Sequence, residues 1–225
     1  NDRWTDRSLE AIAASEAADR ETLAQLKRFQ RGKLSAADQL NYDTFLWLQD
    51  KTVQRQSFRE YLQPIGHQGG VQNADGIIEG LAFNTVRDYR DWLARMPAVI
   101  DQTIALMREG VKAGNVPPRV LMQRVPAQIA AQIVDDPTTS PFYRPFAKFV
   151  GYVPESERAA LQAEARDVIA QQIVPAYRTL QTYFNDEYLP NTRTGIAVSD
   201  LPNGKAYYDF LASDYTTTTL TADEI

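Results

Sequence analysis

The chain has 225 residues, of which 44% are hydrophobic and 24% charged, and its formal net charge is −5. Such values are ordinary for a globular domain, and an acidic chain without a basic block is not expected to bind nucleic acid. No apolar run reaches the roughly 18 residues that a transmembrane segment needs. The chain has no cysteine and a single histidine, His67. Disulfides, thiolate metal sites and any site that needs two imidazoles are therefore excluded within the chain.

The first part of the chain predicts helices. Residues 8–31 favour one or two short helices, and Ser35 with Asp38 is a start signal for a longer helix over residues 36–62. The residues expected to face inward from the first segment are Leu9, Ile12, Leu23 and Leu26. The apolar positions of the second are Leu40, Phe45, Leu48, Val53, Phe58, Tyr61 and Leu62.

A clearer helical pattern follows Thr85. Apolar residues recur every three or four positions over residues 86–111, which predicts one apolar face along a long helix. Thr85 and Asp88 form its start signal, and Gly114 marks its end. Pro97 lies inside the pattern, and because the register is kept across it we expect a kink rather than a second helix.

Two further helical segments complete the pattern. Residues 118–134 predict a helix interrupted by Pro126. A third long helix is predicted from residue 157 to residue 188. Pro175 must bend it, because the proline ring displaces the hydrogen bond to the carbonyl of Gln171.

Two stretches depart from helical periodicity. Residues 62–83 contain five of the eleven glycines, which favours tight turns or a small β-hairpin near residues 62–74. Residues 135–154 are rich in proline and aromatic residues and are too apolar for a solvated loop, so we expect them to lie against the helices.

Together these features predict a mainly α fold, a multi-helix bundle-like array in which residues 1–225 form a single helical unit. Near its end, Tyr207, Leu211 and Tyr215 step by four along a short predicted helix. The four β-branched residues that follow, at 216–219, favour extended structure.

The glycine-rich segment holds the first candidate site. His67 lies beside Gly69 and Gly70 and could be a proton shuttle or a ligand donor, although a loop histidine bonded to the backbone is the commoner case. The glycines match neither the dinucleotide-binding nor the P-loop pattern, so nucleotide binding is disfavoured.

Paired carboxylates form a second candidate. Acid–base hydrolysis could use the pair Asp88 and Asp91, or the adjacent acids at 135–136 and 186–187. Arginines surround the first pair, which is typical of a solvated charged face, so structural roles are favoured.

A third candidate is the turn that ends at Gly204 and the helix after it. Tyr207 and Tyr208 are adjacent, and side chains at adjacent helical positions point about 100° apart. One tyrosine could therefore pack while the other reaches a cleft, and a packed turn with no function is the alternative.

The spacing of Thr221 and Glu224 predicts a capping box, which would start a helix, yet only Ile225 follows. We therefore expect the chain to be part of a longer polypeptide. The apolar faces that the missing partner would cover should then be exposed, and a homodimer could bury them.

Several short motifs, in this order, resemble a known bacterial family, that of domain of unknown function 885. The resemblance covers about residue 35 to the end, and the order and spacing of the motifs carry it. They are Asp88-Tyr89-Arg90-Asp91-Trp92-Leu93, Val116-Pro117-Pro118-Arg119-Val120, Pro141-Phe142-Tyr143-Arg144-Pro145-Phe146, Val174-Pro175-Ala176-Tyr177, Leu201 to Tyr208, and the Thr216 to Ile225 segment.

The resemblance implies a function for the parent protein. The family is similar to helical zinc peptidases of the gluzincin type. Members of the family itself often carry secretion or lipoprotein signals, so a periplasmic or envelope-associated location is implied. Zn would be held by a downstream helix absent from this chain. No catalytic or metal-binding residue is therefore assigned here, and the missing C-terminal half would be a partner of this chain. The chain would form one wall of a cleft for a peptide-like substrate, which Tyr207, Tyr208, Gly204, Gly69, Gly70 and His67 would contact.

A different reading is a helical peptide-binding or interaction module, such as a lipoprotein domain, without catalytic activity. Zinc content and chelator-sensitive cleavage by the intact protein would separate these two readings. A hydrolase that uses only carboxylates is a third reading, and it requires an acid pair in a concave pocket.

Overall fold

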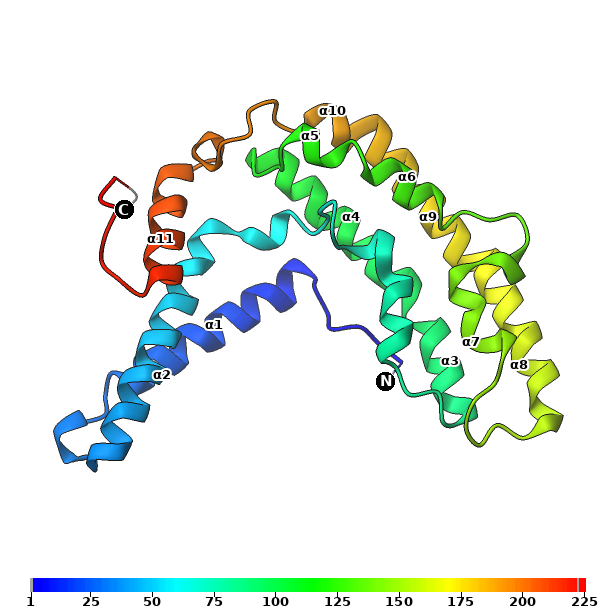
Figure 1. Cartoon of the computed structure of the whole chain (residues 1–225), viewed down its shortest axis with the longest axis horizontal. Coiled ribbons are helices and arrows are strands. Elements are labelled where there is room, and N and C mark those ends of the chain that lie inside the picture. The colour runs from blue at the N-terminus through cyan, green and yellow to red at the C-terminus, as the bar shows by residue number, and fades with distance from the viewer. Residues whose placement is uncertain (1, 222) are drawn as a thin grey trace. The chain divides into compact units, whose positions relative to one another are not determined.

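The computed structural model describes residues 2–221 and 223–225, and within them it contains helices and turns but no strand (Figure 1). The predicted mainly α fold is confirmed. Instead of a hairpin, the glycine-rich segment contains the 3-10 helix Val71–Gly80, and an isolated β-bridge joins Pro118 and Arg193. The chain divides into two compact units, Asn1–Arg7 with Leu62–Ile196, and Ser8–Tyr61 with Ala197–Ile225. That the chain folds as a single unit stays a prediction.

The first unit contains most of the helices. Their bounds are α3 (Val86–Ala94), α4 (Met96–Ala113), α5 (Arg119–Met122), α6 (Val125–Ala130), α7 (Arg144–Ala147), α8 (Glu155–Val168), α9 (Val174–Tyr183) and α10 (Leu189–Asn191). Helix α9 packs against α4 and α6, and α8 packs against α3 and α7. The segment between α6 and α8 lies against the helices as predicted, since Phe142 and Phe146 are fully buried, although Tyr152 near its end is 90% exposed.

The long pattern after Thr85 forms two helices rather than one kinked helix. Helix α3 ends at Ala94 and α4 begins at Met96 with Pro97 in its first turn. A proline is favourable there because its missing N–H would have no partner in the first turn. The residue between the helices, Arg95, keeps right-handed backbone angles, so the buried stripe continues from Trp92 to Met96.

The third long helix is continuous from α8 to α10 but widens twice. Two π-helical turns, Ile169–Ile173 and Phe184–Tyr188, each end two residues before a proline, Pro175 or Pro190. Proline cannot donate to the i−4 carbonyl, and a π turn changes the bonding partner by one residue. The structure therefore shows a local change of helix type just before Pro175, and the bend predicted there stays a prediction.

The second unit is built on α1 (Leu9–Leu26), α2 (Ala36–Arg55) and α11 (Gly204–Thr216). Helices α1 and α2 pack against each other, and Leu23 is buried between them as expected. Leu9 is 41% exposed, so the prediction that its side chain faces inward is wrong. As the first residue of α1 it lies at the helix end, where few other side chains can cover it. The prediction of extended structure at residues 216–219 is also wrong for the first of these residues. Thr216 ends α11 and its hydroxyl donates to the carbonyl of Ala212, 2.7 Å away.

The apolar face of α2 is not covered in the way that its sequence suggested. The helix buries Gln49 and half-buries Tyr42 and Leu46. Its exposed large apolar residues are Leu40, Phe45, Trp47 and Leu48.

At the C-terminus, the Glu224 carboxylate accepts hydrogen bonds from the N–H and hydroxyl of Thr221, both at 2.8 Å. These contacts hold the pKa of Glu224 below its usual value. Residues 223–224 form a turn, and Ala222 lies outside the described residues.

The cap of α3 gives a testable pH dependence. Asp88 Oδ2 accepts from Thr85 N at 2.7 Å and from Asn84 N at 3.0 Å, and these hydrogen bonds lower the pKa of Asp88. A carboxyl with a lowered folded-state pKa stabilises the fold above its unfolded pKa of 3.8, and this contribution is lost as the pH falls through the folded value. We expect Asp88→Asn to weaken this acid dependence, measured as the free energy of unfolding in urea between about pH 5 and pH 2. Equal slopes in both proteins would contradict it.

Candidate functional site

The glycine-rich segment forms a two-residue turn. Gly66 N donates to Gly69 O at 2.8 Å, and Gly69 N donates back to Gly66 O at 3.3 Å. This reciprocal pair encloses His67 and Gln68 and resembles the closing pair of a hairpin, without strands on either side. The small hairpin allowed by the sequence is thus reduced to its turn.

Polar side chains hold this turn and the residues after it within the first unit. Tyr177 donates its hydroxyl to Val71 O at 2.7 Å, and burial raises the pKa of this phenol. Gln128 of α6 donates to His67 O at 2.9 Å. Gln72, fully buried, donates to Gly66 O at 2.7 Å. Two carboxamides therefore hold the turn itself, and the Tyr177 hydroxyl fixes the chain just after it.

Gly70 is required by this geometry. Its φ is +141°, a conformation that L residues rarely adopt. A Cβ at this position would lie 2.5 Å from Gln72 Oε1 and 3.2 Å from the Cα of Ile65. The segment can therefore carry the chain past Ile65 only with glycine at this position.

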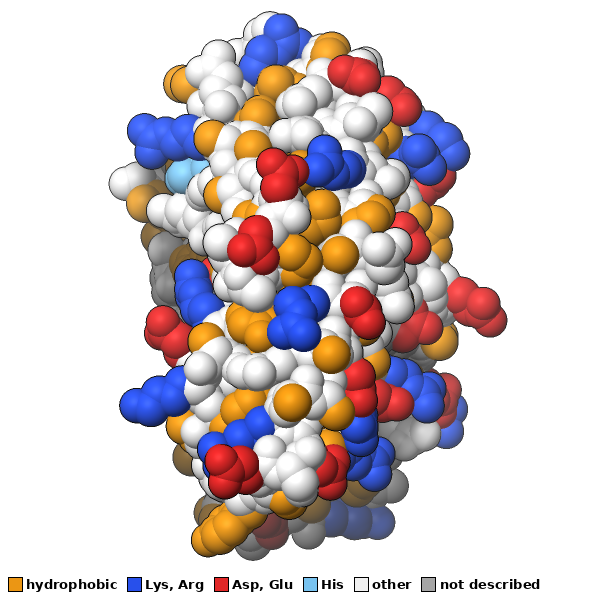
Figure 2. All heavy atoms as spheres, turned by 90° about the vertical axis from the view of Figure 1, so that its right-hand side faces the viewer, with side chains coloured by type: hydrophobic (Ala, Val, Ile, Leu, Met, Phe, Trp, Pro, Cys, Tyr) orange, Lys and Arg blue, Asp and Glu red, His pale blue; other side chains and the backbone are white. Residues whose placement is uncertain are grey.

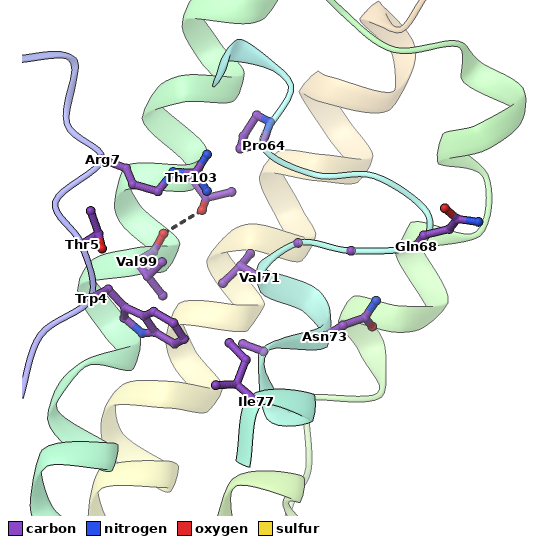
Figure 3. Close-up of a pocket in the computed structure, with 13 residues that line it drawn as sticks. Trp4, Thr5, Arg7, Pro64, Gln68, Val71, Asn73, Ile77, Val99 and Thr103 are labelled. Carbon is purple, nitrogen blue, oxygen red and sulfur yellow. Dashed lines mark hydrogen bonds between the residues drawn. The ribbon is translucent and has the colours of Figure 1, made fainter. Parts of the chain in front are cut away.

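A cavity of about 470 Å³ lies beside the turn (Figure 3). The residues that line it are Trp4, Thr5, Arg7, Pro64, Gln68, Gly69, Gly70, Val71, Asn73, Ala74, Ile77, Val99 and Thr103. Figure 3 shows Val71 and Ile77 pointing toward Trp4, whereas the carboxamides of Gln68 and Asn73 turn away from it. Arg7 is the one ionisable residue in this lining. The cavity thus combines apolar walls with a single positive charge, a composition common in ligand-binding pockets.

The indole of Trp4 forms one wall. Its Nε1 is buried and has no hydrogen-bond partner among the described residues. The guanidinium of Arg95 lies 5.8 Å from the ring centroids of both Trp4 and Trp92, within the range of a cation–π interaction. Partial burial lowers the pKa of Arg95. The N-terminal segment is thereby tied to α3 and α4.

In the second unit, the predicted tyrosines behave differently from each other. The Tyr207 ring lies 4.9 Å from that of Phe58, and its hydroxyl donates to Glu60 Oε1 at 2.8 Å. Burial and this hydrogen bond raise the pKa of Tyr207 to about 12. Tyr208 is 54% exposed. One tyrosine packs and its neighbour is exposed, in keeping with the expected divergence of adjacent helical positions.

The predicted site residues are therefore divided between the two units. Gly69 and Gly70 line the cavity of the first unit, and His67, half-buried, is absent from that lining. Gly204, Tyr207 and Tyr208 belong to the second unit. Substrate contact by any of these residues stays a prediction.

Sequence reasoning missed the other walls of the cavity. Trp4 and Arg7 come from a short segment without periodicity, and Val99 and Thr103 belong to a helix whose pattern indicated only packing. Nothing in the sequence connects these positions. Only the tertiary fold brings them to the glycine turn.

Two of the three carboxylate pairs have structural partners. Asp91 pairs with Arg87 at 3.5 Å, and Asp136 accepts from the N–H of Thr138 at 2.9 Å. In the described part of the chain, no group of three His, Cys, Asp or Glu side chains could hold a metal ion. The surface in Figure 2 mixes acidic, basic and apolar side chains and has no large patch of one sign on that face.

These features define a class: an all-helical protein with an apolar cavity that has a single cation in its lining. The family described as "Bacterial protein of unknown function (DUF885)" matches residues 1–225, and the chain belongs to this family. The resemblance seen in the sequence motifs is thus confirmed, while the relationship to zinc peptidases stays a prediction.

A solved structure shares the fold. It is described as "the putative lipoprotein from Colwellia psychrerythraea", and it superposes with a TM-score of 0.73 at 14% sequence identity. The match covers 95% of this chain but only 39% of that one. No curated protein matches the chain. None of the helices among the described residues is long and apolar enough to cross a membrane.

Proposed function

We propose that this chain is the non-catalytic N-terminal portion of a zinc-peptidase-like hydrolase of the bacterial envelope, and that it forms one wall of the substrate cleft. The first-unit cavity would hold an apolar side chain of a peptide substrate. A periplasmic or envelope location is supported by the fold shared with the Colwellia protein, whose description names a lipoprotein.

The composition of the cavity is the observation that carries this proposal. A volume of about 470 Å³ is within the range of small-ligand pockets, and its walls include Trp4, Val71, Ile77 and Val99. Arg7 at its edge adds a positive charge that favours a peptide carbonyl or carboxylate. Exposed backbone at Gly69 and Gly70 lets an extended peptide approach closely, because no side chain stands in the way.

Zinc does not fit the residues present. The chain has one histidine, and the metal site of such a hydrolase needs several nitrogen or carboxylate ligands. The zinc ligands would therefore lie in the part of the parent protein beyond these residues. The role of this chain would be to bind and orient the substrate.

Ile77→Arg tests the binding role. Ile77 is 39% exposed and points into the cavity, so an arginine there can be solvated without disrupting the core, yet it adds charge and bulk. We expect the Kd for fluorescein-labelled peptides that contain a leucine or phenylalanine to rise by about tenfold, since losing one buried apolar contact costs about 1.5 kcal/mol. Fluorescence anisotropy measures this.

Val120→Arg is the matched control. Val120 is 55% exposed on α5 of the same unit and lies outside the cavity lining. Its affinity for the same peptides should equal that of the wild type. If the two variants behave alike, or if Ile77→Arg binds normally, the cavity is not the peptide site.

A peptide-binding module without chemistry is the second candidate, favoured by the single histidine. The intact parent protein separates the two possibilities. Stoichiometric zinc and peptide cleavage that a chelator abolishes support the hydrolase. Peptide binding without metal or cleavage supports the module.

A further inference from the structure

The second unit has its own cavity, of about 480 Å³, between α2 and α11. Val53, Phe58 and Phe210 contribute apolar walls, and Lys51, Gln54 and Ser213 are polar. Lys51 is the one ionisable residue in this lining. The cavity therefore has an apolar floor and one cation, with no acidic residue.

Lys51 lacks a carboxylate partner among the described residues. Its ammonium donates to Ser213 Oγ at 2.8 Å and lies 5.3 Å from the centroid of the Phe210 ring. Ser213 is already committed, since its hydroxyl donates to Thr218 O at 2.8 Å. An ammonium has three donors, so two of them have no acceptor in the described part of the chain.

Arg55, one turn along α2, provides the comparison. Its guanidinium lies 5.4 Å from the same Phe210 ring. It is neutralised by two carboxylates, since it contacts Asp214 at 2.6 Å and Glu60 at 3.3 Å. Two cations thus share one aromatic ring, and of these two only the one that lines the cavity lacks a counter-ion within the described residues.

We propose that this cavity binds the C-terminal residue of a peptide, with its carboxylate on Lys51 and a large apolar side chain against Phe58 and Phe210. A carboxylate supplies the missing counter-ion and accepts the unused ammonium donors. Gln54 Oε1 accepts no hydrogen bond from the described residues, and it offers an acceptor for the terminal peptide N–H. A hydrocarbon acid lacks that N–H, so the lining favours a peptide. This site lies in a different unit from the cavity of the proposed function and does not depend on it.

The test uses a fluorescein-labelled hexapeptide that ends in phenylalanine, as the free acid and as the C-terminal amide, with the whole chain. We expect the free acid to bind at least about tenfold more tightly than the amide, because a charge-assisted hydrogen bond contributes about 1.5 kcal/mol or more. Lys51→Met should lose this preference, while Lys51→Arg should keep most of it.

Lys33→Met is the matched control. Lys33 belongs to the same unit, is exposed and lies outside the cavity lining. It should bind both peptides as the wild type does, and far-UV circular dichroism should show all variants folded. Equal affinity for acid and amide, normal binding by Lys51→Met, or displacement of the peptide by decanoate at equal concentration would each overturn the proposal.

Discussion

Replacing Gly204 by alanine is expected to lower the free energy of unfolding of the second unit by about 3 kcal/mol, the upper end for overpacking a close contact. A Cβ at this position would lie 2.2 Å from the carbonyl oxygen of Val198 and 2.7 Å from the Cα of Ser199. Both are backbone atoms, so no rotamer change can relieve the clash. The start of α11 would have to move, and with it the packing of Tyr207 on Phe58.

Gly32→Ala is the control for this prediction. A Cβ there meets nothing within 4 Å, so the substitution should change stability by no more than about 1 kcal/mol. Urea denaturation gives the stability, and hydrogen exchange of α11 and α2 amides assigns the change to the second unit. Unaltered exchange in Gly204→Ala would show that residues 198–199 shift without cost.

The fold class could be predicted because helical periodicity is local. The stripe over residues 86–111 and the capping pair Thr85 and Asp88 both appear in the structure. The break at Arg95 was not predictable, because an unbroken register and a proline in a first turn are compatible with one helix or two. The prediction for the apolar residues of α2 was wrong for a different reason. Their pattern defines a face, but only the tertiary structure decides whether that face is covered, and Leu40 is 68% exposed.

The candidate sites were harder to predict from the sequence than the fold class. Glycine density pointed to the turn at Gly69 and Gly70, because close backbone approach needs that residue type. Nothing in the sequence indicates that Lys51 lines the second cavity, since a lysine on a helix is usually a solvated surface residue. Among the described residues, Arg55 has two carboxylate partners and Lys51 has none. The carboxylate of Asp214 and the hydroxyl of Ser213, which contact Arg55 and Lys51, are far from α2 in the sequence, so only the tertiary structure shows this difference.

Trp92→Ala should destabilise the first unit by about 4 kcal/mol. Trp92 is fully buried, its ring centroid lies 5.8 Å from that of Phe142, and its Nε1 donates to Phe142 O at 3.3 Å. The substitution removes a large apolar side chain from the core, leaves a cavity, and leaves a buried carbonyl without this partner. Arg95 would also lose one of its two aromatic contacts, so its position against Trp4, which lines the cavity, would be less well fixed.

Trp47→Ala provides the comparison, because Trp47 is 37% exposed on α2 and the same deletion there should cost about 1 kcal/mol or less. Urea denaturation followed by circular dichroism measures both, and hydrogen exchange in α3 and α9 reports on the first unit. Similar losses for the two tryptophans would mean that the aromatic cluster around Trp92 does not stabilise this unit. A large loss for Trp92→Ala together with weaker peptide binding in the first cavity would link the core to the site, since Arg95 contacts Trp92 on one side and Trp4 on the other.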